Sequence, residues 1–341
     1  MSTMERFCLS ILQTLAYFDL FDRPLTEEEL WRWVWSSEPG VRSQEFIDFC
    51  LQIKKISNLQ APISNQDNFY CLCGREEILQ KYKQRQPLVE KKTAIARRAV
   101  KKILWVPFIR GIFLCNTVAM GSPKEESDVD IFIVVQTGRV WIARLLSTLW
   151  LTLFRLRRNK KHIRDRVDVS FFAADSALDF SKIKLFPDDI YLVYWIAQLI
   201  PLYDPFGISA RIKKENQWIL TYAPNAFLSF RPTESRPKGR GEGVEESFEV
   251  TALRVTTNDE KATVSTPKKF FERAWSGRYG DMVESQAKKM QLLKMKYNTG
   301  SLKDEPDSRV IVSDTMLKFH ENDRRAMYRE KWQEACGRLG V

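Results

Sequence analysis

The chain has 341 residues, of which 44% are hydrophobic and 28% charged, and its formal net charge is +11. This length predicts two or three domains with a sizeable core and excludes a small fold held by disulfides. No apolar run reaches the roughly 20 residues of a membrane-spanning helix, so the composition predicts a soluble globular protein with no transmembrane segment. The excess of positive charge favours polyanionic partners, namely nucleic acid, nucleotides or acidic membrane surfaces, without choosing among them.

The termini and the cysteines favour a cytoplasmic location. The first ten residues, MSTMERFCLS, lack the basic region and apolar core of a secretion signal. The six cysteines (8, 50, 71, 73, 115 and 336) show no framework spacing, and only His162 and His320 are present to support a zinc site. We therefore expect free buried thiols in a reducing compartment.

Residues 1–80 have the pattern of a winged-helix-like domain. Residues 7–20 show helical spacing of apolar positions, Thr26 and Glu29 form a capping box before a second helix, and Ser43 starts a third. Two strand-like runs around a polar turn follow, in NLQAPISNQDNFYCLC. Three helices followed by a hairpin is the order of a winged helix, a class that often docks its third helix in a DNA groove.

The charges of the third predicted helix argue against such docking. It carries Glu45 and Asp48, and its basic residues, Lys54 and Lys55, come only at its end. This is poor chemistry for a major groove. A protein or intramolecular docking role is therefore favoured for this segment, and DNA binding stays as the weaker alternative.

Residues 81–107 predict a basic connecting helix that runs from residue 88 to 105 and is ended by Pro107. Ile95, Ala99 and Ile103 are expected to face a core while the basic side chains lie in solvent. The basic residues between positions 84 and 110 are Arg85, Lys91, Lys92, Arg97, Arg98, Lys101, Lys102 and Arg110.

The rest of the chain predicts a central α/β domain at residues 108–230, a disordered linker or insertion at 231–267 and a helical region at 268–341. The pattern of the central part predicts a strand, a loop, a strand, a helix, a strand and a helix. The last of these helices lies in PDDIYLVYWIAQLIPLYD. The helix at 140–156 is apolar but short and carries Arg144, so we interpret it as buried or amphipathic. The C-terminal region is predicted to be helical at both ends with a loop between.

Two aspartates stand at the start of the predicted strand DVDIFIVV. The period-two alternation of a strand points Asp128 and Asp130 to the same face. Two like charges so close favour a cation beside them, and hard oxygen ligands favour Mg2+ or Mn2+, which bring nucleotide phosphates as further ligands.

A third acid lies in the apolar strand of RVDVSFF. Asp168 has apolar neighbours on both sides, and burying an unpaired carboxylate is costly. A third carboxylate on a neighbouring strand is what a two-metal site requires. The alternative is an ion pair between Asp168 and one of the nearby arginines.

The order of these motifs resembles the DNA polymerase beta-like nucleotidyltransferase superfamily over roughly residues 108–175. The pattern is IFLCNT, then VAMGSPKEES, then DVDIFIVV, and finally RVDVSFF. The resemblance implies an α/β (α+β) nucleotidyltransferase core with a small mixed sheet. The wider chain, including SDTMLKFHENDRR, is also similar to a bacterial group in which a winged-helix-like segment precedes such a domain and a helical tail follows.

One departure concerns the end of the first strand, where the family usually has Gly-Ser or Gly-Gly. Gly121-Ser122 lies too close to Asp128, and the expected interval leads to Asn116-Thr117. Asn can partly imitate glycine in unusual backbone conformations. The resemblance implies that Asn116 and Thr117 cradle the β and γ phosphates, and that Gly121 and Ser127 form the turn leading to the aspartate strand.

The resemblance also implies a mechanism. Asp128 and Asp130 would hold two magnesium ions, and Asp168 would complete the second site and help to deprotonate an acceptor hydroxyl. This hydroxyl would attack the α-phosphorus of a nucleoside triphosphate, expected to be ATP, as pyrophosphate leaves. The acceptor, whether small molecule, protein or RNA, is not specified by the sequence.

Several further residues are weaker candidates, each with a structural alternative. Lys124, Arg164 and Arg166 are neutralisers of developing charge or parts of a solvated basic face. His320 is a nucleotide contact or, more in keeping with a lone histidine, a cap or packing residue. The aromatic residues expected to stack on a base or to belong to the core are Tyr191, Tyr194 and Trp195.

Three functions are consistent with the sequence. The leading one is a metal-dependent nucleotidyltransferase. The second is a catalytically impaired nucleotide-sensing or nucleic-acid-binding regulator, which Asn116 supports and the retention of three acids opposes. The third takes the D-x-D motif as the manganese site of a glycosyltransferase, which would require a longer βαβ half before the motif.

Overall fold

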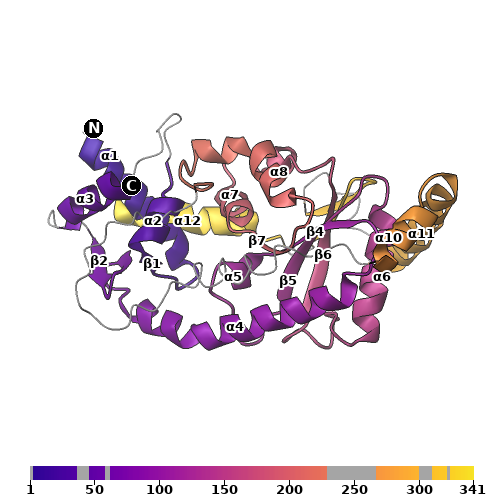
Figure 1. The fold of residues 1–341 in the computed structure, drawn as a ribbon. Coiled ribbons are helices and arrows are strands. Elements are labelled where there is room, and N and C mark those ends of the chain that lie inside the picture. The colour runs from indigo at the N-terminus through magenta and orange to yellow at the C-terminus, as the bar shows by residue number, and fades with distance from the viewer. Residues whose placement is uncertain (1–2, 37–45, 58–61, 229–265, 299–308, 321–322) are drawn as a thin grey trace. The chain divides into compact units, whose positions relative to one another are not determined.

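The computed structural model describes residues 3–36, 46–57, 62–228, 266–298, 309–320 and 323–341. Within these residues, eleven α-helices and two β-sheets form a mixed α/β fold (Figure 1), which is the class that the sequence predicts. In the same part of the chain, no helix is long and apolar enough to cross a membrane. All six cysteines are free thiols, as expected, but the expected burial holds only for Cys71, Cys115 and Cys336, because Cys8 and Cys50 are partly buried and Cys73 is exposed.

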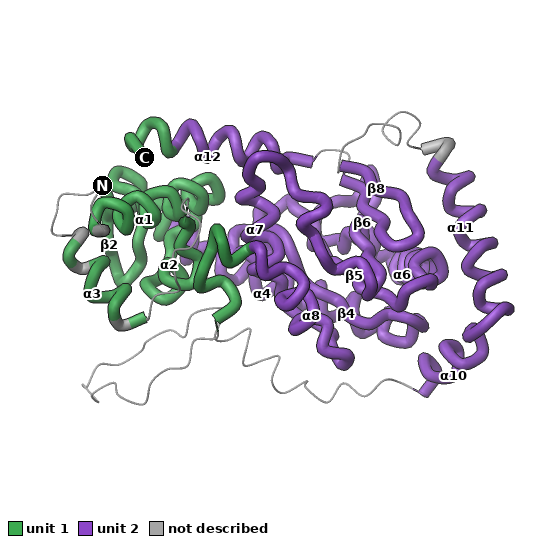
Figure 2. Tube along the Cα trace, turned by 90° about the horizontal axis from the view of Figure 1, so that it is seen from above, with its two compact units in different colours: residues 1–79, 219–261, 336–341 green, residues 80–218, 262–335 purple. Residues whose placement is uncertain are grey.

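The chain divides into two compact units (Figure 2). Unit 1 comprises residues 1–79, 219–261 and 336–341, and unit 2 comprises residues 80–218 and 262–335. The predicted N-terminal domain supplies most of unit 1, whereas the predicted central domain and the tail each contribute residues to both units. Of the predicted linker, residues 231–265 lie outside the described residues, and Thr266 and Pro267 begin a helix.

Unit 1 contains three helices and a hairpin in the order that the sequence predicts, and the predicted start of the third helix at Ser43 lies outside the described residues. Its elements are α1 (Thr3–Asp19), β1 (Leu25–Thr26), α2 (Glu27–Trp33), α3 (Phe46–Ser57), β2 (Ile63–Gln66) and β3 (Phe69–Leu72). The three strands form an antiparallel sheet of order β1-β3-β2. The hairpin turns at Asp67 and Asn68, which both have positive φ, a conformation that Asp and Asn tolerate better than most residues.

The predicted capping box at the start of α2 is confirmed. The Thr26 hydroxyl accepts a hydrogen bond from the Glu29 backbone N–H at 3.2 Å, and the Glu29 carboxylate accepts one from the Thr26 backbone N–H at 3.0 Å. Glu29 also pairs with the buried Arg23 at 2.5 Å. The start of this helix is therefore fixed by contacts that the local sequence encodes.

Unit 2 is built around a six-stranded sheet of order β7-β4-β5-β6-β9-β8. The strands are β4 (Ile109–Leu114), β5 (Val129–Val135), β6 (Val167–Ala174), β7 (Ile200–Tyr203), β8 (Val310–Val312) and β9 (Met316–Phe319). β5 and β6 are parallel, whereas all other neighbouring pairs are antiparallel. The crossover between the parallel strands is α6 (Val140–Leu153), the apolar helix that the sequence predicts as buried or amphipathic.

Helices cover the sheet of unit 2 on both faces (Figure 1). α4 (Glu77–Ile103) and α6 pack on the face that receives Ile131 and Ile133. The other face carries Phe132, whose ring contacts Trp195 of α7 (Ile190–Ala197) at 5.4 Å between centroids. The remaining helices are α5 (Asn116–Ala119), α8 (Ile208–Glu215), α10 (Thr266–Ala274), α11 (Arg278–Asn298) and α12 (Arg325–Leu339).

Three predictions of secondary structure were wrong in part. α4 begins at Glu77 rather than residue 88 and contains Pro87, because the buried Leu79 and Tyr82 make packing of the first turns outweigh the cost of an interior proline. The segment after α7 forms β7, an edge strand in which Pro201 is tolerated. The loop predicted in the tail contains β8 and β9, which are too short to give a period-two signal.

Candidate metal centre

Three aspartates come together where β5 and β6 begin. Asp128 directly precedes β5, while Asp130 and Asp168 are the second residues of β5 and β6 and lie opposite each other in the parallel pairing. Carboxylate oxygens of all three lie within 4.8 Å of one another. Val129 and Ile131 enter the core on the α4 face, so alternation points Asp130 to the opposite face. These three oxygens form a group that could hold a metal ion.

Burial and the neighbouring acids both destabilise the charged forms of Asp130 and Asp168. The pKa of Asp130 is raised to about 8, mainly by burial and next by the negative charges of Asp128 and Asp168. Burial also raises the pKa of Asp168, against the lowering effect of Arg158. A divalent cation would offset this repulsion, and an all-oxygen donor set suits magnesium or manganese.

Arg158 supplies a positive charge in direct contact with the cluster. Its Nη1 lies 3.0 Å from Asp128 Oδ2 and 2.9 Å from Asp168 Oδ2. The backbone fixes its position, because the Arg158 N–H donates to the Val167 carbonyl at 2.9 Å. The Arg158 side chain is 42% exposed, so solvent screens these ion pairs and the guanidinium can exchange partners.

The sequence did not single out Arg158. It is one of seven basic residues between positions 155 and 166, and only the pairing with β6 decides which of them faces the acids. Arg164 instead contacts Glu125 and Asp165, and Lys124 is exposed. Arg166 contributes through its backbone, because its carbonyl oxygen accepts a hydrogen bond from the Val129 N–H at 2.8 Å.

The prediction for Lys92 was wrong. The sequence pattern places it in solvent with the other cations of α4, but its side chain is fully buried. Its Nζ donates to the carbonyl oxygens of Ser127 at 2.6 Å and Glu125 at 3.3 Å and pairs with Asp165 at 3.3 Å. Lys92 thereby ties together the two loops that lead into β5 and β6, and so positions the aspartates they carry.

Asn116 lies beside Asp130 at the end of β4. It has φ of +56°, the left-handed conformation for which glycine is the usual residue. Its side chain makes a hydrogen bond with Asp130 that opposes the rise in the pKa of that carboxyl. Thr117 follows in α5, and Gly121, with φ of +80°, and Ser127 belong to the segment that joins α5 to β5.

The aromatic residues of α7 separate into two groups. Tyr194 and Trp195 are buried in the core, the alternative that the sequence left open for them. Tyr191 stacks on Tyr328 of α12, with ring centroids 5.4 Å apart and planes at 9°, and its hydroxyl donates to Asn116 Oδ1 at 3.3 Å. The contacts therefore run from α12 through Tyr191 and Asn116 to Asp130.

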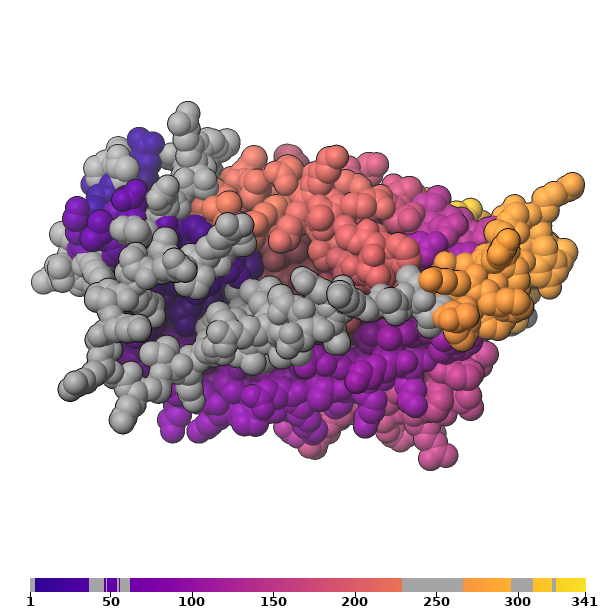
Figure 3. All heavy atoms as spheres, viewed as in Figure 1, coloured from indigo at the N-terminus to yellow at the C-terminus, as the bar shows by residue number. Residues whose placement is uncertain are grey.

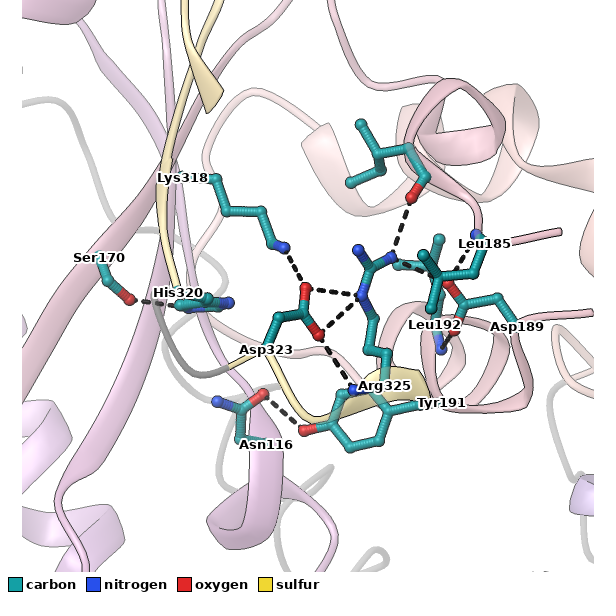
Figure 4. A network of polar contacts seen from close by, with 11 residues as sticks. Asn116, Ser170, Leu185, Asp189, Tyr191, Leu192, Lys318, His320, Asp323 and Arg325 are labelled. Carbon is teal, nitrogen blue, oxygen red and sulfur yellow. Dashed lines mark hydrogen bonds and ion pairs between the residues drawn. The ribbon is translucent and has the colours of Figure 1, made fainter. Parts of the chain in front are cut away.

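His320 lies just after β9, next to the strand that carries Asp168. Its Nε2 is 2.8 Å from Ser170 Oγ (Figure 4). Burial is the main cause that lowers the pKa of His320 to about 4, so the imidazole is neutral at pH 7. This contact fits the packing role that the sequence favoured for a lone histidine.

A buried ion network ties the C-terminal segment to α7 (Figure 4). Asp323 contacts Lys318 Nζ at 2.7 Å and Arg325 Nε at 2.9 Å, and Arg325 Nη1 contacts Asp189, the N-cap of α7, at 2.8 Å. Nothing in the sequence pattern indicates these pairs, because Lys318 lies in the predicted loop of the tail, Asp323 and Arg325 lie in the helix predicted after it, and Asp189 lies in the central domain. They hold the start of α12, and with it Tyr328, against α7.

The fold and the site together define a mixed α/β protein with a three-carboxylate cluster where two parallel strands begin. No protein-family model, no curated protein and no solved structure matches the chain. The assignment of a function therefore depends on the residues themselves.

Proposed function

We propose that this protein is a metal-dependent nucleotidyltransferase that transfers a nucleoside monophosphate from a nucleoside triphosphate to a hydroxyl acceptor. The observation that carries the proposal is the convergence of Asp128, Asp130 and Asp168 on two adjacent parallel strands, with oxygens within 4.8 Å of one another. The sequence order of strand, short helix, D-x-D strand, crossover helix and third-acid strand supports the same reaction class. It is the order that the resemblance implies for residues 108–175.

The donor set fits the proposed cofactor. Three carboxylates offer only hard oxygen ligands, which suit Mg2+ or Mn2+ and are poor ligands for softer metals. Asp128 and Asp168 are 17% and 20% exposed, so an ion that carries nucleotide phosphates as further ligands can reach them. Bound magnesium would neutralise the triphosphate and the leaving pyrophosphate.

The proposed roles of the chain's own groups follow from their positions. Asp128, Asp130 and Asp168 would hold the metal ions, and Asp168 would also accept the proton of the acceptor hydroxyl. The hydroxyl oxygen forms a bond to the α-phosphorus, the bond from the α-phosphorus to the bridging oxygen breaks, and pyrophosphate leaves. Arg158 contacts Asp128 and Asp168 from the exposed side, so it is placed to bind a phosphate oxygen when it releases them.

Unit 1 fits a winged-helix-like accessory domain within this proposal. Three helices precede the β2–β3 hairpin, and β1 completes a sheet of order β1-β3-β2. In α3 the described residues include Asp48 on the exposed surface, which disfavours a DNA groove as its partner. A docking role toward protein remains the favoured function for this unit.

The proposal is tested by measuring which phosphate of the nucleoside triphosphate is transferred to the acceptor. The protein is incubated with magnesium and each of the four nucleoside triphosphates, labelled at the α or the γ phosphate, with cell extract as the source of acceptor. We expect transfer of α label and release of pyrophosphate, both lost in the Asp128→Asn/Asp130→Asn variant. Transfer of γ label, or α transfer that persists in the variant, would contradict the proposal.

A second candidate function is a nucleotide-sensing or nucleic-acid-binding regulator without turnover. The contact of Arg158 with both Asp128 and Asp168 favours it, because this pairing gives two acids a partner that needs no metal. Magnesium-dependent binding of nucleoside triphosphate without transfer of either label would favour the regulator.

A further inference from the structure

α11 of unit 2 has two apolar stripes, and only one of them is packed. The inner stripe, which includes Ala287, Gln291 and Met295, is buried against the side of unit 2 that contains α6. Its polar member is satisfied, because Gln291 Nε2 donates to the Trp141 carbonyl at 2.8 Å. The inner stripe explains why α11 packs on unit 2. It does not explain why the opposite side of the helix also carries apolar side chains.

The outer stripe is exposed. Its members, Tyr279, Met282, Met290 and Leu293, have 57%, 53%, 53% and 61% of their surface exposed. Their spacing of three, eight and three residues places them on one side of a helix. Figure 3 shows α10 and α11, in orange, projecting at one end of unit 2, and Phe270 of α10 adds a side chain that is 66% exposed.

Unpaired cations border this stripe. Arg278, Lys289 and Lys294 are exposed and make no ion pair with any described residue. By contrast, Lys288 is turned toward the domain and contacts Asp314 at 2.7 Å. The outer face of α11 therefore combines apolar side chains with free positive charge.

The helix is held rigidly in this position. The Glu284 carboxylate accepts hydrogen bonds from the backbone N–H groups of Trp141 and Ile142, both at 2.8 Å, and so caps the start of α6. A Cβ on Gly280 would lie 1.7 Å from the Trp275 carbonyl oxygen, so only glycine allows α11 to leave α10 at this corner. The exposed stripe is thus presented by an anchored helix.

We propose that the outer face of α11 docks on an anionic phospholipid surface. Apolar side chains flanked by Lys and Arg are the composition of helices that lie in the interface of an acidic membrane. Aliphatic Met and Leu add nothing to recognition of a nucleic-acid backbone, which disfavours that polyanion. The surface is independent of the carboxylate cluster, so this proposal does not rest on the proposed nucleotidyl transfer.

The test is co-sedimentation of the full chain with phosphatidylcholine vesicles and with vesicles that also contain phosphatidylglycerol. We expect binding to the anionic vesicles that weakens with salt, and little binding to the neutral ones. Met290→Gln/Leu293→Gln and Lys289→Gln/Lys294→Gln should each lower the partition coefficient by about tenfold or more. Leu51→Gln, which removes an equally exposed side chain in unit 1, should leave binding unchanged.

Several outcomes would overturn the proposal. They are no binding of the parent protein to anionic vesicles, equal binding to neutral ones, or a loss in Leu51→Gln as large as that in the α11 variants. A dimer that dissociates in Met290→Gln/Leu293→Gln would assign the stripe to a second copy of the chain instead. Circular dichroism of each variant separates a lost contact from a lost fold.

Discussion

Two clusters of buried charge in unit 2 differ in their balance. The network of Lys318, Asp323, Arg325 and Asp189 pairs two cations with two acids, and none of these side chains is more than 7% exposed. The cluster at β5 and β6 has three acids against Arg158, and its members are partly exposed to solvent. A closed, balanced network stabilises a chain connection, whereas an open cluster with excess charge has room for an ion from solution.

The largest effect is expected when the open cluster loses one charge. Asp130→Asn should lower nucleotidyl transfer by roughly 1000-fold or more, because a ligand of the metal is lost. The same change should leave the free energy of unfolding equal or higher, because it removes a carboxyl whose charged form is destabilised first by burial and then by the charges of Asp128 and Asp168. Calorimetric titration with Mn2+ and urea unfolding measure both effects. A large loss of stability with unchanged Mn2+ affinity would break the comparison.

The balanced network should respond in the opposite way. Arg325→Met leaves Asp323 and Asp189 buried without their shared partner, so we expect the free energy of unfolding to fall by about 3–5 kcal/mol. Arg329→Met is the matched control on the same helix, since Arg329 makes an exposed contact with the Phe186 carbonyl. Equal urea midpoints for the two variants would show that the network contributes no stability of its own.

The two clusters also differ in how far the sequence predicted them. Asp128, Asp130 and Asp168 could be found because an acid inside an apolar strand is conspicuous, and because alternation fixes the face of each side chain. Arg158 and Lys92 could not, since each lies in a run of similar cations and tertiary contacts select the one that is used. Arg325 and Asp189 are paired across 136 positions of sequence, a distance over which local pattern carries no information.

A third charged group, around Lys268, sharpens the comparison because it has two cations against one acid and its central amine is fully buried. Lys268 is fully buried, with Arg110 and Glu272 nearby, and burial lowers the pKa of its amine to about 7. An enclosed group of this kind can adjust only by losing a proton. Between pH 7 and 10.5 the unfolded chain binds more protons at this residue than the folded chain, so the stability of the folded state should rise with pH.

Lys268→Met tests that pH dependence. Urea unfolding at pH 7, 8 and 9 should show a rise in the stability of the parent protein relative to the variant. Lys269→Met is the control, because Lys269 is exposed on the same helix. A difference between parent and Lys268→Met that stays constant with pH would show that the amine keeps its proton in the folded state.

The smallest effect concerns the contacts that orient one acid of the open cluster. Tyr191→Phe removes only the hydroxyl that donates to Asn116 Oδ1, so the Asn116 amide is less firmly held toward Asp130. We expect Mn2+ affinity to fall by a factor that corresponds to about 1 kcal/mol, while Tyr279→Phe on the exposed face of α11 leaves it unchanged. Asn116→Gly keeps the left-handed backbone but removes the amide, and should weaken binding at least as much. A gain of affinity in Asn116→Gly would mean that asparagine impairs the site, and would move the assignment toward the regulator.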